Sequence, residues 1–255
     1  MIRENKVKKI LEDGGTVVGS FVKANDPAVV EILGKAGFDF FVADNEHVAM
    51  NKNDMVNLIR SGELADIVPI IRVRENRDVE ILQALDSGAF GIQVPNIDTK
   101  KDAVQLADNA KYAPAGKRGF SPSVRAAAFG MMDKQEYVKK ANENTLVVGH
   151  CESVTSMNNL DDILEEDIDV MFIGPMDLSQ SLGIIGQGDH PKLKESIDKI
   201  IDKVTSAGKV VGMVASDAEG AQKLIDKGVR YVMISSDLGM LASTATKNLK
   251  QLKNQ

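Results

Sequence analysis

The stretch "GFDFFVADNEHVAMN", residues 37–51, contains the unit that decides the fold. Its apolar segment "FDFFVA" (38–43) has the length and the aromatic content of a buried strand. Four polar residues, Asp44, Asn45, Glu46 and His47, follow this segment directly, and "NDMVNLIRSGEL" then places apolar residues at helical spacing. The stretch therefore predicts a strand, a polar turn and a helix, which together form one β/α unit.

The same order recurs along the chain, and most of the apolar runs lead through a turn into an amphipathic segment. Eight runs are found: "TVVGSFV" (16–22), "FDFFVA" (38–43), "VPIIRV" (68–73), "AFGIQVP" (89–95), "TLVVGH" (145–150), "DVMFIG" (169–174), "KVVGMVA" (209–215) and "RYVMIS" (230–235). Eight strand–helix units predict a (β/α)8 TIM barrel, as a single domain covering residues 1–255. An open doubly wound sheet is the alternative, but its Gly-rich phosphate fingerprint is missing after the first strand.

Composition favours a globular protein that acts on small molecules. The chain of 255 residues is 43% hydrophobic and 27% charged, which is enough to bury a sizeable core. Its 37 acidic and 31 basic side chains give a net charge of -6, which argues against nucleic-acid or anionic-membrane partners. The start of the chain, "MIRENKVKKILEDGG", lacks the apolar centre of a signal peptide, so we expect a cytoplasmic protein. Cys151 is the only cysteine, which excludes an intrachain disulfide and a zinc site with several thiolates.

One interval interrupts the alternation of strands and helices. Residues 111–130, "KYAPAGKRGFSPSVRAAAFG", form a long loop before the fifth predicted strand. A loop of this length is usually functional, and it is as compatible with a lid as with a solvated excursion or an oligomer contact.

Polar residues collect where the predicted strands end. Since the carboxyl ends of barrel strands share one rim, where catalytic groups lie, we expect these side chains to form the site. They are Asp44, Glu46 and His47 after the second strand, Arg72 after the third, Asn96 after the fourth, His150 and Glu152 after the fifth, and Asp177 after the sixth.

Two of these acids are candidate metal ligands. Glu152 and Asp177 end adjacent strands, and incomplete coordination by oxygen atoms suits Mg²⁺ or Mn²⁺. The alternative for Asp177 is a helix N-cap, since it precedes a helical stretch. The same segment, Gly174, Pro175, Met176 and Asp177, would offer free backbone N–H groups to a substrate carboxylate.

The remaining rim residues suggest proton transfer. His47 is a candidate general base, and Asp44, three residues earlier, could orient its ring. Arg72 requires an anionic or carbonyl partner, either a substrate or an acid such as Asp44 or Asp86. Strand alternation places His150 and Glu152 on one face and Cys151 on the other, under a helix.

Taken together, these motifs resemble those of the HpcH/HpaI aldolase family, metal-dependent pyruvate aldolases related to 4-hydroxy-2-oxoheptanedioate aldolase and 2-dehydro-3-deoxyglucarate aldolase. The similarity is nearly full-length and rests on "AGFDFFVADNEH", "IIRV", "LDSGAFGIQVPN", "YAPAGKRG", "CES" and "FIGPMDLSQSLG", in the family order.

The resemblance implies a class II aldolase that reversibly cleaves a 4-hydroxy-2-oxoacid to pyruvate and an aldehyde, assembled as a homohexamer. It implies a divalent cation, Mg²⁺, Mn²⁺ or Co²⁺, held by Glu152 and Asp177 and chelated by pyruvate. It further implies that Arg72 polarises the ketone or enolate oxygen and that His47 with Asp44 moves protons. Asp86 matches a family acid near the subunit contacts.

Two departures from the family pattern keep alternatives open. His150 stands where the family usually has glutamine, and it could join the metal shell or replace a hydrogen bond; Asn45 stands where the family has glycine. The alternatives are a CoA-ester lyase of the citramalyl or malyl type and a catalytically silent barrel. A Schiff-base aldolase would use Lys23, the only lysine close after a predicted strand end, but it leaves the carboxylates and Arg72 without a role.

Overall fold

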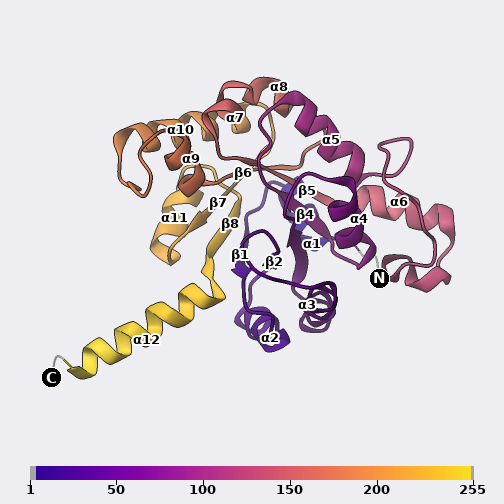
Figure 1. Ribbon diagram of the computed structural model, residues 1–255, viewed down its shortest axis with the longest axis horizontal. Coiled ribbons are helices and arrows are strands. Elements are labelled where there is room, and N and C mark those ends of the chain that lie inside the picture. Colours follow the sequence, from indigo (N-terminus) through magenta and orange to yellow (C-terminus); the bar gives the residue numbers. More distant parts are fainter. Residues whose placement is uncertain (1–3, 254–255) are drawn as a thin grey trace.

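Eight parallel strands close into a barrel in which each strand pairs with its neighbours in sequence and β8 pairs with β1 (Figure 1). The computed structural model describes residues 4–253. The predicted (β/α)8 TIM barrel is confirmed. The strands are β1 Val17–Val22, β2 Phe40–Asp44, β3 Val68–Arg72, β4 Gly91–Val94, β5 Leu146–Cys151, β6 Val170–Ile173, β7 Val210–Ala215 and β8 Tyr231–Ser236.

Helices surround the barrel, and several begin at caps that the sequence supplies. The side chain of Asp26 caps α2, and Asn51 forms a capping box with Asp54 at the start of α3. The helices are α1 Lys6–Glu12, α2 Pro27–Ala36, α3 Lys52–Ala65, α4 Asp78–Asp86, α5 Lys100–Ala110, the 3₁₀ segment η1 Arg125–Gly130, α6 Lys134–Asn144, α7 Val154–Asn158, α8 Leu160–Leu164, α9 Pro175–Ser181, α10 Pro191–Ser206, α11 Ala218–Asp226 and α12 Asp237–Lys253.

The core has two layers, one between the strands and the helices and one inside the barrel. Aromatic rings fill much of the interior: Phe40 stacks on Tyr231 with 4.3 Å between ring centroids. Gly212 leaves room for this packing, since a Cβ there would lie 2.9 Å from the Tyr231 ring. The filled interior leaves only the strand ends and their loops for chemistry.

The long loop before β5 lies at the amino-terminal end of its own barrel. Its Arg118 donates to Asp86 at the end of α4 (2.6 Å), and its Arg125 pairs with Glu63 near the end of α3. The C-terminal ends of both helices lie at the amino-terminal end of the barrel, opposite the rim formed by the carboxyl ends of the strands. Within one chain the loop therefore does not cover the rim, so the lid interpretation is not supported.

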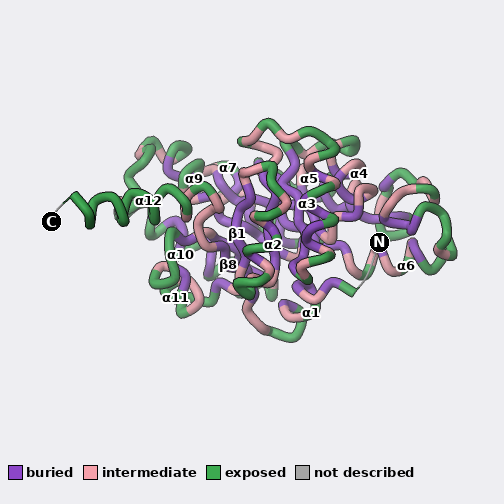
Figure 2. The backbone as a smooth tube through the Cα atoms, turned by 90° about the horizontal axis from the view of Figure 1, so that it is seen from below, coloured by how far each residue is buried: buried purple, intermediate pink, exposed green. Residues whose placement is uncertain are grey.

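Helix α12 extends away from the barrel, and its described residues from 241 onward are all exposed (Figures 1 and 2). None of its described residues is buried, and Leu238, Leu241, Leu249 and Leu252 are among the exposed apolar side chains. Across residues 4–253, no helix combines the length and apolar character needed to cross a bilayer.

Candidate active site

A buried ion pair links the ends of β2 and β3. Arg72 donates from Nε to Oδ1 of Asp44 at 3.0 Å and from Nη2 to Oδ2 at 2.6 Å. Of the two acids considered as partners of Arg72, the structure pairs it with Asp44, whereas Asp86 pairs with Arg118. Burial opposes the charged form of Asp44, but the hydrogen bonds and charge of Arg72 outweigh it and lower the pKa of this carboxyl below its usual value.

Glu46 is a member of the site to which sequence reasoning assigned no role. Its Oε2 lies 3.1 Å from Nη1 of Arg72 and 3.7 Å from Nε2 of His47. Burial raises the pKa of Glu46, and the nearby cationic groups only partly offset this. The only sequence signal was its position between the strand end and His47.

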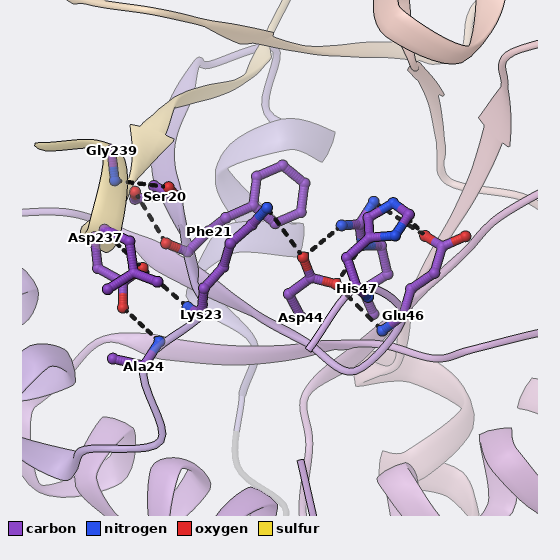
Figure 3. A network of polar contacts seen from close by, with 12 residues as sticks. Ser20, Phe21, Lys23, Ala24, Asp44, Glu46, His47, Asp237 and Gly239 are labelled. Carbon is purple, nitrogen blue, oxygen red and sulfur yellow. Dashed lines mark hydrogen bonds and ion pairs between the residues drawn. The ribbon is translucent and has the colours of Figure 1, made fainter. Parts of the chain in front are cut away.

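The His47 ring faces Glu46 rather than Asp44 (Figure 3). Asp44 instead accepts the backbone N–H groups of Glu46 and His47, at 3.2 and 3.1 Å, and so fixes the turn that carries the histidine. The His47 side chain is 55% exposed, which leaves it accessible to a substrate at the rim. Asp44 thus positions His47 through the backbone.

Lys23 approaches the same carboxylate from β1. Its Nζ lies 3.6 Å from Oδ2 of Asp44. Asp237, the first residue of α12, accepts the backbone N–H groups of Lys23 and Ala24 at 2.9 and 2.8 Å (Figure 3). The base of the projecting helix is therefore tied to a loop beside Asp44.

Glu152 is held from two sides at the end of β5. Its Oε1 accepts the backbone N–H of Asn96 at 2.8 Å, and its Oε2 lies 2.8 Å from Nδ1 of His150. Burial opposes ionisation of Glu152, but His150 and the Asn96 N–H outweigh it and lower the pKa of this carboxyl. A buried carboxylate kept ionised is suited to hold a cation.

Asp177 lies in the segment that follows β6, the strand next to β5. It lies in the first turn of α9, whose N-cap is Gly174, so the alternative that Asp177 serves as an N-cap is wrong. Gly174 packs on Glu152, because a Cβ there would lie 2.6 Å from Oε2 of the glutamate. Asp177 is therefore only three residues along the chain from Gly174, whose backbone packs against Glu152.

The donor set of these two carboxylates fits an oxygen-coordinated divalent cation. Among residues 4–253, no group of three or more His, Cys, Asp and Glu side chains is arranged to hold a metal. A cation here would take two protein carboxylates, with water and substrate oxygens as the remaining ligands.

Cys151 and Asn45 stand beside site residues in the sequence but have structural roles. Cys151 is buried in the layer between strands and helices, as predicted, and burial raises the pKa of its thiol to about 11. Asn45 donates its backbone N–H to the Arg72 carbonyl and is not among the residues with positive φ. This position therefore does not require glycine.

The sequence model of the HpcH/HpaI aldolase/citrate lyase family matches residues 18–244. The chain belongs to this family. It is 37% identical to a hydroxypyruvate/pyruvate aldolase of Roseobacter denitrificans over 242 residues, and this match covers 94% of each sequence. It is 32% identical over 244 residues to a 5-keto-4-deoxy-D-glucarate aldolase of Shigella boydii, covering 95% of this chain and 94% of the relative.

A solved structure agrees with this membership in the family. An HpcH/HpaI aldolase from Desulfitobacterium hafniense superposes with a TM-score of 0.92 at 29% identity, over 97% of this chain and 96% of that one. The family match and the aldolase relatives make this chain an enzyme, a carbon–carbon lyase.

Proposed function

We propose that this lyase is a metal-dependent, class II aldolase that reversibly cleaves a 4-hydroxy-2-oxoacid into pyruvate and an aldehyde. The observation that supports the proposal is the set of polar groups at the carboxyl ends of the strands: a buried arginine, an exposed histidine, a buried glutamate and, in the turn after the next strand, an aspartate. These residues are Arg72, His47, Glu152 and Asp177. The aldolase names of the two relatives support the same reaction class.

Glu152 and Asp177 are the residues that would hold the cation, Mg²⁺, Mn²⁺ or Co²⁺. When bound, it would supply positive charge beside the carbonyl oxygen of the 2-oxoacid. The backbone N–H groups of Met176 and Asp177, in the Gly174–Pro175 turn, would bind the substrate carboxylate.

The protein's own groups account for the proton and electron movements of cleavage. His47 takes the proton of the C4 hydroxyl as that oxygen becomes the aldehyde carbonyl. The electron pair of the breaking C3–C4 bond moves toward the C2 oxygen, where the Arg72 guanidinium stabilises negative charge. Each terminal nitrogen of Arg72 has a second N–H beyond those used by Asp44 and Glu46. The protonated His47 then gives this proton to C3, which completes pyruvate and returns the histidine to its starting state.

Proton exchange at the pyruvate methyl group tests this chemistry without knowledge of the aldehyde. NMR in deuterated buffer would follow the methyl signal with chelator-stripped protein and after return of Mg²⁺, Mn²⁺ or Co²⁺. We expect exchange only with metal, and strongly reduced exchange in Arg72→Ala. Absence of exchange with every metal would refute the proposal, and a parallel assay with an acyl-CoA substrate would reveal a CoA-ester lyase.

We also propose that the enzyme works as a homo-oligomer, a hexamer by family resemblance. Helix α12 supports this, since its own chain leaves its leucines largely exposed to solvent. Light scattering after gel filtration measures the mass; Leu241→Glu and Leu249→Glu should lower it, whereas the exposed polar change Thr246→Glu should not. A monomeric wild type at micromolar concentration would refute the proposal.

A further inference from the structure

We propose that His150 is a positioning residue that fixes the Glu152 carboxylate, as the last member of a hydrogen-bond chain that begins at Tyr231 and runs through Gln93. His150 is therefore not a ligand of the cation. The inference rests on the proposed function only in taking Glu152 as a metal ligand.

The chain crosses the barrel interior from β8 through β4 to β5. The Tyr231 hydroxyl donates to Oε1 of Gln93 at 3.2 Å, and Nε2 of Gln93 lies 2.8 Å from Nε2 of His150. Nδ1 of His150 lies 2.8 Å from Oε2 of Glu152. The four side chains are 0%, 0%, 1% and 6% exposed, so water cannot readily substitute for any of these partners.

The order of donors and acceptors fixes the tautomer of the ring. Since Oε1 of Gln93 accepts from Tyr231, the amide NH₂ group faces His150 and must donate to a bare Nε2. The ring proton then sits on Nδ1 and is donated to Glu152. In this arrangement each of these side-chain nitrogen and oxygen atoms has a hydrogen-bond partner.

Both ring nitrogens of His150 are occupied in this way: Nδ1 carries the proton, and the lone pair of Nε2 accepts from Gln93, so neither nitrogen is free to bind a cation. Packing restrains the ring as well: it stacks on Phe172 with 4.9 Å between centroids and an interplanar angle of 28°. The other oxygen of Glu152 is held by the Asn96 N–H. Each carboxylate oxygen therefore has one fixed donor and keeps lone-pair capacity for a metal.

Glutamine at position 150, the residue usual in the family, offers an N–H on a more flexible side chain. Histidine supplies the same donor from a ring that stacking holds in place. We therefore expect either residue at position 150 to donate a hydrogen bond to Glu152. Gln93 and Tyr231 were not singled out from sequence, although a glutamine inside an apolar strand was a usable signal.

The first test is the tautomer of His150 in the full-length, chelator-stripped protein. Two-bond ¹H–¹⁵N correlation spectra distinguish the ring nitrogens, and with three histidines in the chain the signal is assigned by its loss in His150→Gln. We expect the proton on Nδ1 alone. A proton on Nε2 alone, or on both nitrogens, would overturn the proposal. Addition of diamagnetic Zn²⁺ should leave both nitrogen shifts nearly unchanged, whereas a large shift of either would identify His150 as a ligand.

The second test is Mn²⁺ affinity by calorimetry, with folding checked by circular dichroism. We expect about 10–100-fold weaker binding in His150→Phe, which keeps the stacking but loses the donor. His150→Gln should recover most of this loss, Tyr231→Phe should weaken binding by a few-fold, and the control His190→Gln should bind like wild type. Unchanged affinity in His150→Phe would overturn the proposal. No Mn²⁺ binding by the wild type would instead refute the proposed function, and the tautomer would still decide the hydrogen-bond chain.

Discussion

Replacing Gly174 with alanine should displace Glu152 and weaken the binding of a divalent cation. The backbone does not require glycine here, because φ at Gly174 is -94° and so lies outside the left-handed region. The added methyl carbon, however, would lie 2.6 Å from Oε2 and 2.8 Å from Cβ of Glu152. The carboxylate or the turn must therefore move.

The size of the effect follows from these distances. Ordinary contact with a Cβ begins at 3.4 Å, so Oε2 must retreat by roughly 0.8 Å. Such a shift disturbs the 2.8 Å hydrogen bonds from His150 and Asn96. Loss of the groups that orient a metal ligand typically weakens metal binding about 10–100-fold, and overpacking costs about 1–3 kcal/mol of stability.

Calorimetric titration of stripped protein with Mn²⁺, together with thermal unfolding, measures both quantities. Gly188→Ala is the matched control, because nothing lies within 4 Å of the methyl group that it would add. We expect the control to match the wild type in both measurements. Wild-type affinity and an unchanged Tm in Gly174→Ala would refute the packing of this turn on Glu152 or the role of Glu152 as a ligand.

Arg72→Ala should abolish aldol cleavage and lower the free energy of unfolding by about 3–5 kcal/mol, because Asp44 is left buried without its charged partner. Urea unfolding, with the exposed Arg74→Ala as control, checks the stability, and cleavage at a near wild-type rate would remove Arg72 from the reaction. The pKa of Asp44 is lowered from 3.8, so the folded state binds fewer protons than the unfolded state between the two pKa values. This stabilisation is complete above the unfolded pKa and is lost as the pH falls through the folded one; Asp44→Asn should flatten the acid side of the stability curve, and equal slopes would contradict the argument. Cys151, whose pKa is raised to about 11, should react with iodoacetamide only after unfolding, and rapid labelling of the native protein would show otherwise.

The fold was readable from sequence because its signals are local. Each apolar run from 16–22 to 230–235 became a strand with nearly the same limits. Period-two alternation placed Cys151 in the outer layer, and the barrel rule gathered the strand-end residues on one rim. The family motifs indicated membership in the HpcH/HpaI family, and the match of the family's sequence model confirmed it.

The site could be predicted only as a set of residues. Sequence left Arg72 with two possible acidic partners, assigned the His47 ring to Asp44 and gave Glu46 no role. The two acids on this turn, Asp44 and Glu46, differ only in where their side chains reach, and sequence does not show this. Likewise, the loop at 111–130 could have been a lid until its contacts placed it at the opposite end of the barrel.

The sequence by itself therefore determined the barrel, the rim that carries the candidate site and the residue types on it, since periodicity and motif order are properties of neighbouring residues. Only the tertiary structure decided which atoms meet: the Arg72–Asp44 pair joins two strands 28 residues apart, and the Tyr231–Gln93 hydrogen bond spans 138. Partners so distant along the chain are brought together by barrel closure and side-chain packing, which no local pattern encodes.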